Sequence, residues 1–222
     1  MLLSLIIAEA ALETVPNSIA RHPSVVKHAA KIGKSADKIL LDRSYHHHAM
    51  LKLKDNAKRG RPDLVHFALL EAISTPLYIK NLVKVYVHTI ANKVIFINDG
   101  VRLPKSYFRF EGLMEELFQN KKVKGDDRIL LELRDLPFCD LLELIKPANV
   151  IGLSRVGVRS SAGEVAKKAD NNAALIVGGF SRGHFSKEVS KKIQYLYSIT
   201  DFGLEAHVVI ARVLYECEKL LL

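Results

Sequence analysis

The second half of the chain alternates short apolar segments with helical patterns, and this order limits the fold more than any other feature of the sequence. Such alternation is typical of α/β proteins with a largely parallel sheet. The strand candidates cover residues 128–134, 149–153, 173–177 and 194–199, and the helix candidates cover residues 138–145, 162–169 and 204–222. An apolar segment at residues 1–8 predicts a buried first strand. The sequence therefore predicts an α/β fold.

The first half predicts a less regular arrangement. A helical pattern begins at Pro23 and ends at Gly33, and a second one covers residues 64–73. Between them we expect a short strand at 38–41 and a polar, basic working loop at 44–63. His46, His47 and His48 lie in that segment. Consecutive side chains cannot all face one point, so the triplet predicts a solvated loop and no metal site.

A β-hairpin and a basic helix follow. Residues 84–89 and 93–97 alternate at period two around Ala91-Asn92, and Pro104 stands where the next helix would start. We expect residues 80–124 to form a basic, RNA-binding lobe inserted on, or packed beside, the α/β core. The whole chain, residues 1–222, is then one domain.

Glycine-rich segments follow three of the strand candidates. They are Gly152–Gly157, Gly178–Gly183 and the stretch from Thr200 to Gly203. Ligands of open α/β sheets bind at the carboxyl ends of the strands. None of these loops has the dinucleotide fingerprint or the Gly-Lys-Ser/Thr of a P-loop. The sequence therefore predicts one crevice in which backbone groups hold a cofactor that has no pyrophosphate.

The balance of charge indicates a polyanionic partner. The chain has 33 Lys and Arg against 24 Asp and Glu, a formal net charge of +9. A basic enzyme or a membrane-surface protein is also compatible with this charge. Cys139 and Cys217 match no zinc or disulfide pattern, so a reducing cytoplasm is expected. The apolar start reaches Glu9 too early for a signal or membrane helix.

Lys58, Arg59 and Arg61 precede a helix and predict a phosphate-binding edge. Asp63 is placed either to cap that helix or to brace Arg61, and a solvated basic turn is the simpler alternative.

Arg102, Lys105 and Arg109 form a second basic group. On a helix, their spacing of three and four would place them on one face that suits an RNA backbone. Tyr107 or Phe108 would be available to stack on a splayed base, and a core position is the alternative for Phe108 and Phe110.

Four motifs together carry a family resemblance. They are Arg61-Pro62-Asp63, Val85 to Thr89, the run from Arg102 to Met114, and the Gly178–Gly183 loop with Ser198-Ile199-Thr200 and Leu204-Glu205-Ala206. With these motifs the chain resembles the archaeal and eukaryotic rRNA pseudouridine N1-methyltransferases, the nucleolar essential protein family of the SPOUT class. The lack of long terminal extensions resembles the archaeal members.

The resemblance implies a SPOUT-type α/β trefoil-knot fold and a cytoplasmic homodimer that needs no metal and no membrane. It implies an S-adenosyl-L-methionine-dependent enzyme that methylates N1 of a pseudouridine in small-subunit (16S) rRNA during ribosome biogenesis. The implied cofactor-binding residues are Leu153, Gly178, Gly183, Ile199, Thr200, Asp201, Phe202, Gly203 and Leu204. The implied rRNA-binding residues are Arg61, held by Asp63, with Arg102, Lys105 and Arg109. Lys105 departs from the Arg that is frequent there, which keeps the charge but loses the bidentate fork.

The proton on pseudouridine N1 must leave before or during attack. Asp63, Asp201 and Glu205 are the candidate acceptors, and the sequence does not rank them. Two other hypotheses remain at this point. One is a non-catalytic rRNA-binding ribosome assembly factor, and the other is an unrelated nucleotide-dependent α/β enzyme such as an oxidoreductase. Binding of S-adenosylmethionine separates the methyltransferase from both.

Overall fold

A single mixed sheet organises the chain in the computed structural model, which describes residues 2–125, 128–169 and 172–222. Met1, at the start of the predicted first strand, lies outside the described residues. Within them, eight strands form the sheet in the order β4-β5-β3-β2-β1-β7-β6-β8. The strands are β1 (Leu3–Ala10), β2 (Val83–Thr89), β3 (Lys93–Ile97), β4 (Lys122–Lys124), β5 (Ile129–Asp135), β6 (Asn149–Arg159), β7 (Ala173–Gly178) and β8 (Tyr195–Ser198).

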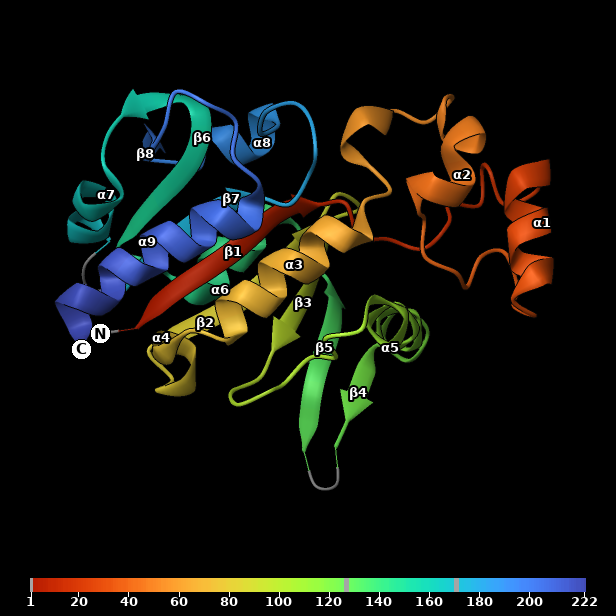
Figure 1. Cartoon of the computed structure of the whole chain (residues 1–222), viewed down its shortest axis with the longest axis horizontal. Helices are drawn as coiled ribbons and strands as arrows, with labels where there is room; N and C mark the ends of the chain where they lie inside the picture. Colours follow the sequence, from red (N-terminus) through yellow and green to blue (C-terminus); the bar gives the residue numbers. More distant parts are fainter. Residues whose placement is uncertain (1, 126–127, 170–171) are drawn as a thin grey trace.

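Helices cover both faces of this sheet. They are α1 (Pro23–Lys31), α2 (Arg43–Met50), α3 (Pro62–Ile73), α4 (Pro76–Ile79), α5 (Tyr107–Asn120), α6 (Phe138–Ile145), α7 (Ala162–Lys168), α8 (Lys187–Ser190) and α9 (Ala206–Leu221), with a 3₁₀ turn, η1, at Asn56–Lys58. Figure 1 shows α3 and α9 lying side by side across one face, with α6 on the other and α1 and α2 at one end of the molecule.

The central strand explains the two cores. Every residue of β1 is buried. Leu5 and Ile7 pack into the core that contains α3, α5 and α9, whereas Ile6 and Ala8 pack into the core beneath α6 and α8. A strand with parallel neighbours is buried on both faces, which explains why β1 is apolar except at Ser4 and Glu9. A third, smaller core joins α1 to α2.

The parallel pairing brings several loops to one edge. β1 pairs in parallel with β7, β7 with β6, and β6 with β8. Beyond the last paired residues, Gly179 continues the contact, because its N–H donates to Ala8 O and its carbonyl accepts the N–H of Ala11, both at 2.8 Å. The loops after these strands therefore lie beside one another, as the alternating pattern predicted.

The structure corrects two predictions in the first half. The histidine triplet lies in α2 rather than in a loop, because Asp42 Oδ1 accepts the Ser44 N–H at 2.7 Å and caps the helix. His46 is fully buried, while His47 and His48 are exposed. The predicted strand at 38–41 is reduced to an isolated bridge between Thr14 and Leu40.

In the segment at 80–124, β2 pairs with β1 and the hairpin β2–β3 continues the main sheet. The helix of this segment, α5, begins at Tyr107 instead of Pro104. Arg102 and Lys105 therefore precede the helix, and the predicted single helical face that included Arg109 does not form. The carbonyl of Pro104 accepts a 2.7 Å hydrogen bond from His66 Nε2 of α3, which ties this segment to α3.

The segment Gly152–Gly157 was predicted to be a loop, but in the structure it is part of strand β6. The pairing of β6 with β8 shifts between Leu153 and Val158 and then resumes at Val158 and Arg159, so β6 runs on to Arg159.

Candidate functional site

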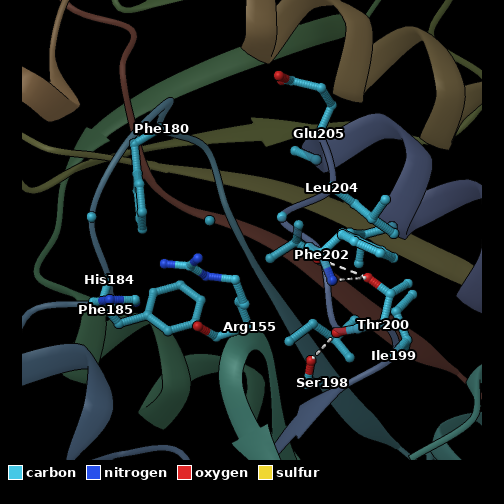
Figure 2. A pocket seen from close by; sticks show the side chains of 18 of the residues that line it. Arg155, Phe180, His184, Phe185, Ser198, Ile199, Thr200, Phe202, Leu204 and Glu205 are labelled. Carbon is cyan, nitrogen blue, oxygen red and sulfur yellow. Dashed lines mark hydrogen bonds between the residues drawn. The ribbon is translucent and has the colours of Figure 1, made fainter. Parts of the chain in front are cut away.

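A cavity of about 480 Å³ opens where the loops after β7 and β8 meet β6. Figure 2 shows this cavity with its lining side chains. Four parts of the chain contribute: the middle of β6, the loop after β7, the end of β8 with the loop that follows it, and the first turn of α9. Leu64 of α3 completes the wall. The cavity size falls within the range of about 300–1,000 Å³ that small-molecule sites occupy.

Most of the residues expected to hold a cofactor line this cavity. They are Leu153, Gly178, Gly183, Ile199, Thr200, Phe202, Gly203 and Leu204. Asp201 is not among the lining residues. Its side chain is 79% exposed, and its Oδ1 lies 3.6 Å from Arg159 Nε.

Hydroxyl groups hold the shape of the loop after β8. Ser198 Oγ donates to Thr200 O at 2.6 Å, and Thr200 Oγ1 donates to Phe202 O at 2.7 Å. The Phe202 N–H donates back to Thr200 Oγ1 at 3.0 Å. Such local side-chain bonds replace a regular ladder and fix a turn. Small polar groups therefore fix the backbone of this loop, which also contributes Ile199, Phe202 and Leu204 to the wall.

The position of the Phe180 ring explains why β7 ends in a glycine, Gly178. A Cβ added at Gly178 would lie 2.8 Å from Phe180 Cζ, so a larger residue would displace that ring from the cavity wall. Phe180 packs edge-on against Phe185 with ring centroids 5.9 Å apart. Glycine permits this close approach.

Sequence reasoning missed several lining residues, of which Arg155 is the most distinctive. Figure 2 shows its side chain pointing into the cavity between Phe180 and Phe202. Arg182, His184 and Phe185 also line the wall. The sequence shows Arg155 as the cation of the Gly152–Gly157 segment. The direction in which its side chain points depends on the continuation of β6 through this segment.

The sequence left two roles open for Asp63, capping α3 or bracing Arg61, and its hydrogen bonds show the second. Arg61 Nε and Nη2 donate to the two carboxylate oxygens of Asp63, each at 2.8 Å. No side chain caps α3 at Arg61, so Asp63 braces Arg61. These hydrogen bonds raise the pKa of the Arg61 guanidinium, and the charge of nearby Glu205 adds to the effect. Because Leu64 lines the cavity, this ion pair stands at its border.

The predicted phosphate-binding edge of three cations is wrong for two of them. Lys58 Nζ lies 2.7 Å from Glu9 Oε2, and Arg59 donates to both oxygens of Glu13 at 2.6 and 2.7 Å. Glu9 and Glu13 are buried, and a buried carboxylate needs a counter-charge. Arg61 alone remains at the exposed edge.

Arg102, Lys105 and Arg109 are all exposed. The rings between them have different roles. Tyr107 donates its hydroxyl to Asp42 Oδ2 at 2.9 Å, and burial raises the pKa of this tyrosine, with Asp42 adding to the shift. Phe108 is 80% exposed.

Phe110, by contrast, is a core residue that stacks on His66 with ring centroids 4.2 Å apart. The cation-flanked ring that is open to a ligand is therefore Phe108.

Among the residues that the structure describes, no group of His, Cys, Asp and Glu side chains is arranged to hold a metal ion. In the same part of the chain, no helix is both long and apolar enough to span a membrane.

The fold and the cavity define a class: an α/β protein with a glycine-lined crevice at the carboxyl ends of parallel strands, bordered by exposed cations. A family model described as EMG1/NEP1 methyltransferase matches residues 5–218. The chain belongs to this family, as the resemblance in its motifs predicted. Membership of a methyltransferase family is evidence against the alternative of an unrelated oxidoreductase.

Two relatives show how far the likeness extends. A protein of Staphylothermus marinus named ribosomal RNA small subunit methyltransferase Nep1 is 40% identical over 220 residues, which cover 98% of this chain and 96% of the relative. The Saccharolobus solfataricus protein of the same name is 38% identical over 222 residues, covering 100% and 99%.

A solved structure is similar over the same length. Nep1 of Archaeoglobus fulgidus, in a crystal structure bound to S-adenosylhomocysteine, superposes with a TM-score of 0.89 at 35% identity and covers 99% of this chain and 98% of its own.

We expect the ion pairs Arg61–Asp63 and Arg59–Glu13 to contribute differently to the free energy of unfolding. The Arg61–Asp63 side chains are about one third exposed, at 34% and 35%, so Asp63→Asn should lower the free energy of unfolding by less than about 1 kcal/mol. Glu13→Gln removes the charge that compensates buried Arg59 and should cost about 3 kcal/mol. Urea denaturation of both variants measures the difference. Equal losses would contradict this assignment of one exposed and one structural pair.

Proposed function

We propose that this protein is an S-adenosylmethionine-dependent methyltransferase that methylates N1 of a pseudouridine in small-subunit rRNA during ribosome biogenesis. The observation that carries the proposal is the junction at the start of α3. There, Leu64 lines the cavity while Arg61, three residues earlier, stands at the exposed border. A cofactor site thereby adjoins a surface that suits a polyanion. Family membership and the S-adenosylhomocysteine bound to the Archaeoglobus fulgidus protein support this choice.

The residues of the cavity fit this cofactor. Leu153, Ile199 and Leu204 offer apolar surface for an adenine ring, and the glycine loops allow a ligand to approach the backbone. Arg155 offers a cation for the carboxylate of the methionine part. When bound, the cofactor supplies an electrophilic methyl group. We retain Gly178, Gly183 and residues 199–204 as its proposed contacts, with Asp201 at the outer side of its loop.

The chain's own task is to align the nucleophile and to receive a proton. In-line substitution depends chiefly on positioning, which ordered walls provide. Of the three candidate acceptors, Asp63 is engaged by Arg61, and Asp201 lies beside Arg159. Glu205 lines the cavity and lies near enough to Arg61 to raise its pKa. We therefore propose Glu205 as the proton acceptor, with Arg61 as a neighbouring positive charge for the anion that forms.

The proposal extends to assembly and topology. We propose a homodimer in which the C-terminal half of each chain forms a trefoil knot, in the cytoplasm.

Methyl transfer to two RNA hairpins, which differ only in uridine or pseudouridine at the target base, tests the function. We expect the methyl group on pseudouridine alone. Transfer to uridine alone would contradict the assignment of the base. Binding of cofactor and RNA without any transfer would favour the assembly factor, and so would RNA binding in the absence of any heat from titrated S-adenosylmethionine.

Arg102→Ala and Arg109→Ala should each weaken RNA binding and lower the salt dependence of the binding constant by about one released counterion. The affinity for S-adenosylhomocysteine should stay within twofold of wild type, since neither residue lines the cavity. Filter binding at several salt concentrations measures the first effect. Exposed Lys167→Ala, on α7, is the control and should change neither quantity. An equal loss of cofactor affinity would show that these arginines are structural.

Glu205→Gln should lower kcat for methyl transfer by about 10²-fold or more, the usual contribution of a general base, while RNA affinity is retained. Single-turnover transfer with saturating RNA measures the effect. Glu143→Gln is the matched control, because Glu143 is exposed on α6. A Glu205→Gln variant as fast as the control would exclude Glu205 as the acceptor.

A further inference from the structure

We propose that Lys58 and Glu9 form a clamp that positions the loop after β7 and so sets the affinity of the cavity for its cofactor. This inference rests on the proposed function of that cavity. It assigns a positioning role to two residues that do not themselves line the cavity.

Lys58 contacts the loop at two places. Its ammonium lies over the ring of Phe180, 4.5 Å from the centroid, while it also binds Glu9. Its methylene stem runs past Gly183, where an added Cβ would lie 3.3 Å from Lys58 Cε. Phe180 and Gly183 both line the cavity. The neighbouring residue adds a third tie, because Ser181 Oγ donates to Ala57 O at 3.2 Å.

Glu9 holds the far end of the same loop. While its Oε2 binds Lys58, its Oε1 accepts the Ser186 N–H at 3.0 Å. One buried carboxylate thereby joins the η1 segment to the residue where the loop enters α8. Both oxygens are used, so the link has a defined geometry.

The backbone at Glu9 is strained in a way that favours this contact. Glu9 has a φ of 49°, in the left-handed region, and the pairing of β1 with β2 is irregular between Ile7 and Ala10. A residue other than glycine is strained in that region, and such positions cluster at functional sites. Here the irregularity marks the point where β1 supplies the carboxylate of the clamp.

The loop after β7 is rich in glycine, so contacts that restrict its backbone have a large effect on its conformation. Gly183 has a φ of 101°, and the loop contains a second glycine, Gly179. Without other contacts, the backbone of the loop could therefore adopt many conformations when no ligand is bound. A loop that is already ordered loses less conformational entropy when a ligand binds. The clamp therefore contributes to affinity without touching the ligand.

The adjacent ion pair provides a built-in comparison. Arg59 is partly buried, as Lys58 is, and Glu13 is buried, as Glu9 is, with side-chain exposures of 17% and 5% against 16% and 8%. Neither Arg59 nor Glu13 lines the cavity. If Lys58 only neutralises a buried carboxylate, loss of either cation will have the same consequences.

The experiment compares Lys58→Met with Arg59→Met in the full-length protein. Both variants keep an unbranched stem and lose a buried charge, so both should lower Tm. Calorimetric titration with S-adenosylhomocysteine should give a Kd at least fivefold weaker for Lys58→Met, and within twofold of wild type for Arg59→Met. Lys58→Arg, which keeps the charge, should restore most of the affinity.

The outcomes are distinct. A Lys58→Met variant that binds as wild type does, or an Arg59→Met variant that is weakened equally, overturns the clamp and leaves the proposed function intact. A wild-type protein that binds no S-adenosylhomocysteine overturns both. If Lys58→Met does not fold, Glu9→Gln provides the same comparison, because it removes the charge but keeps an acceptor for Ser186. An unchanged Kd in that variant overturns the clamp.

Discussion

The burial of two carboxylates at the end of the central strand determines how the working parts of this protein are arranged. Glu9 lies in β1, which is covered on both faces, Glu13 follows that strand, and neither carboxylate reaches water freely. Each therefore requires a cation, and Lys58 and Arg59 supply them. These pairs hold the segment before α3 against the carboxyl edge of the sheet. Arg61 is thereby left at the border of the cavity.

Residues 58–64 connect the proposed cofactor cavity to the basic edge at Arg61. Residues 58–64 provide a contact to the cofactor loop, a structural ion pair, a braced arginine at the exposed edge and a wall residue of the cavity. The proposed methyl donor and the proposed RNA therefore meet where α3 begins. The glycine loops need no dinucleotide fingerprint, since side-chain hydroxyls and a phenylalanine give them their shape.

Much of the fold was predictable because its signals are local. The hairpin at β2 and β3 and the α/β order of the second half follow from periodicity within a few residues, and the loops at Gly178–Gly183 and Thr200–Gly203 follow from their turn residues. The loop predicted at the histidine triplet was wrong because the helix there depends on the Asp42 cap and on a 3.0 Å hydrogen bond between His46 Nε2 and His28 Nδ1 of α1. The basic face at Arg102 to Arg109 failed because His66, 38 residues away, engages the carbonyl of Pro104.

The sequence was sufficient to predict the fold class, the strand ends around which the cavity forms and the family to which the chain belongs. The tertiary structure was needed to show which of the cations are held by partners distant along the chain. Lys58, Arg59 and Arg61 are alike in sequence, yet the partners of the first two lie 49 and 46 residues away, whereas Arg61 is braced by a residue two positions on. A cation is visible in a sequence, but a counter-charge that lies far away along the chain meets it only when packing brings the two together.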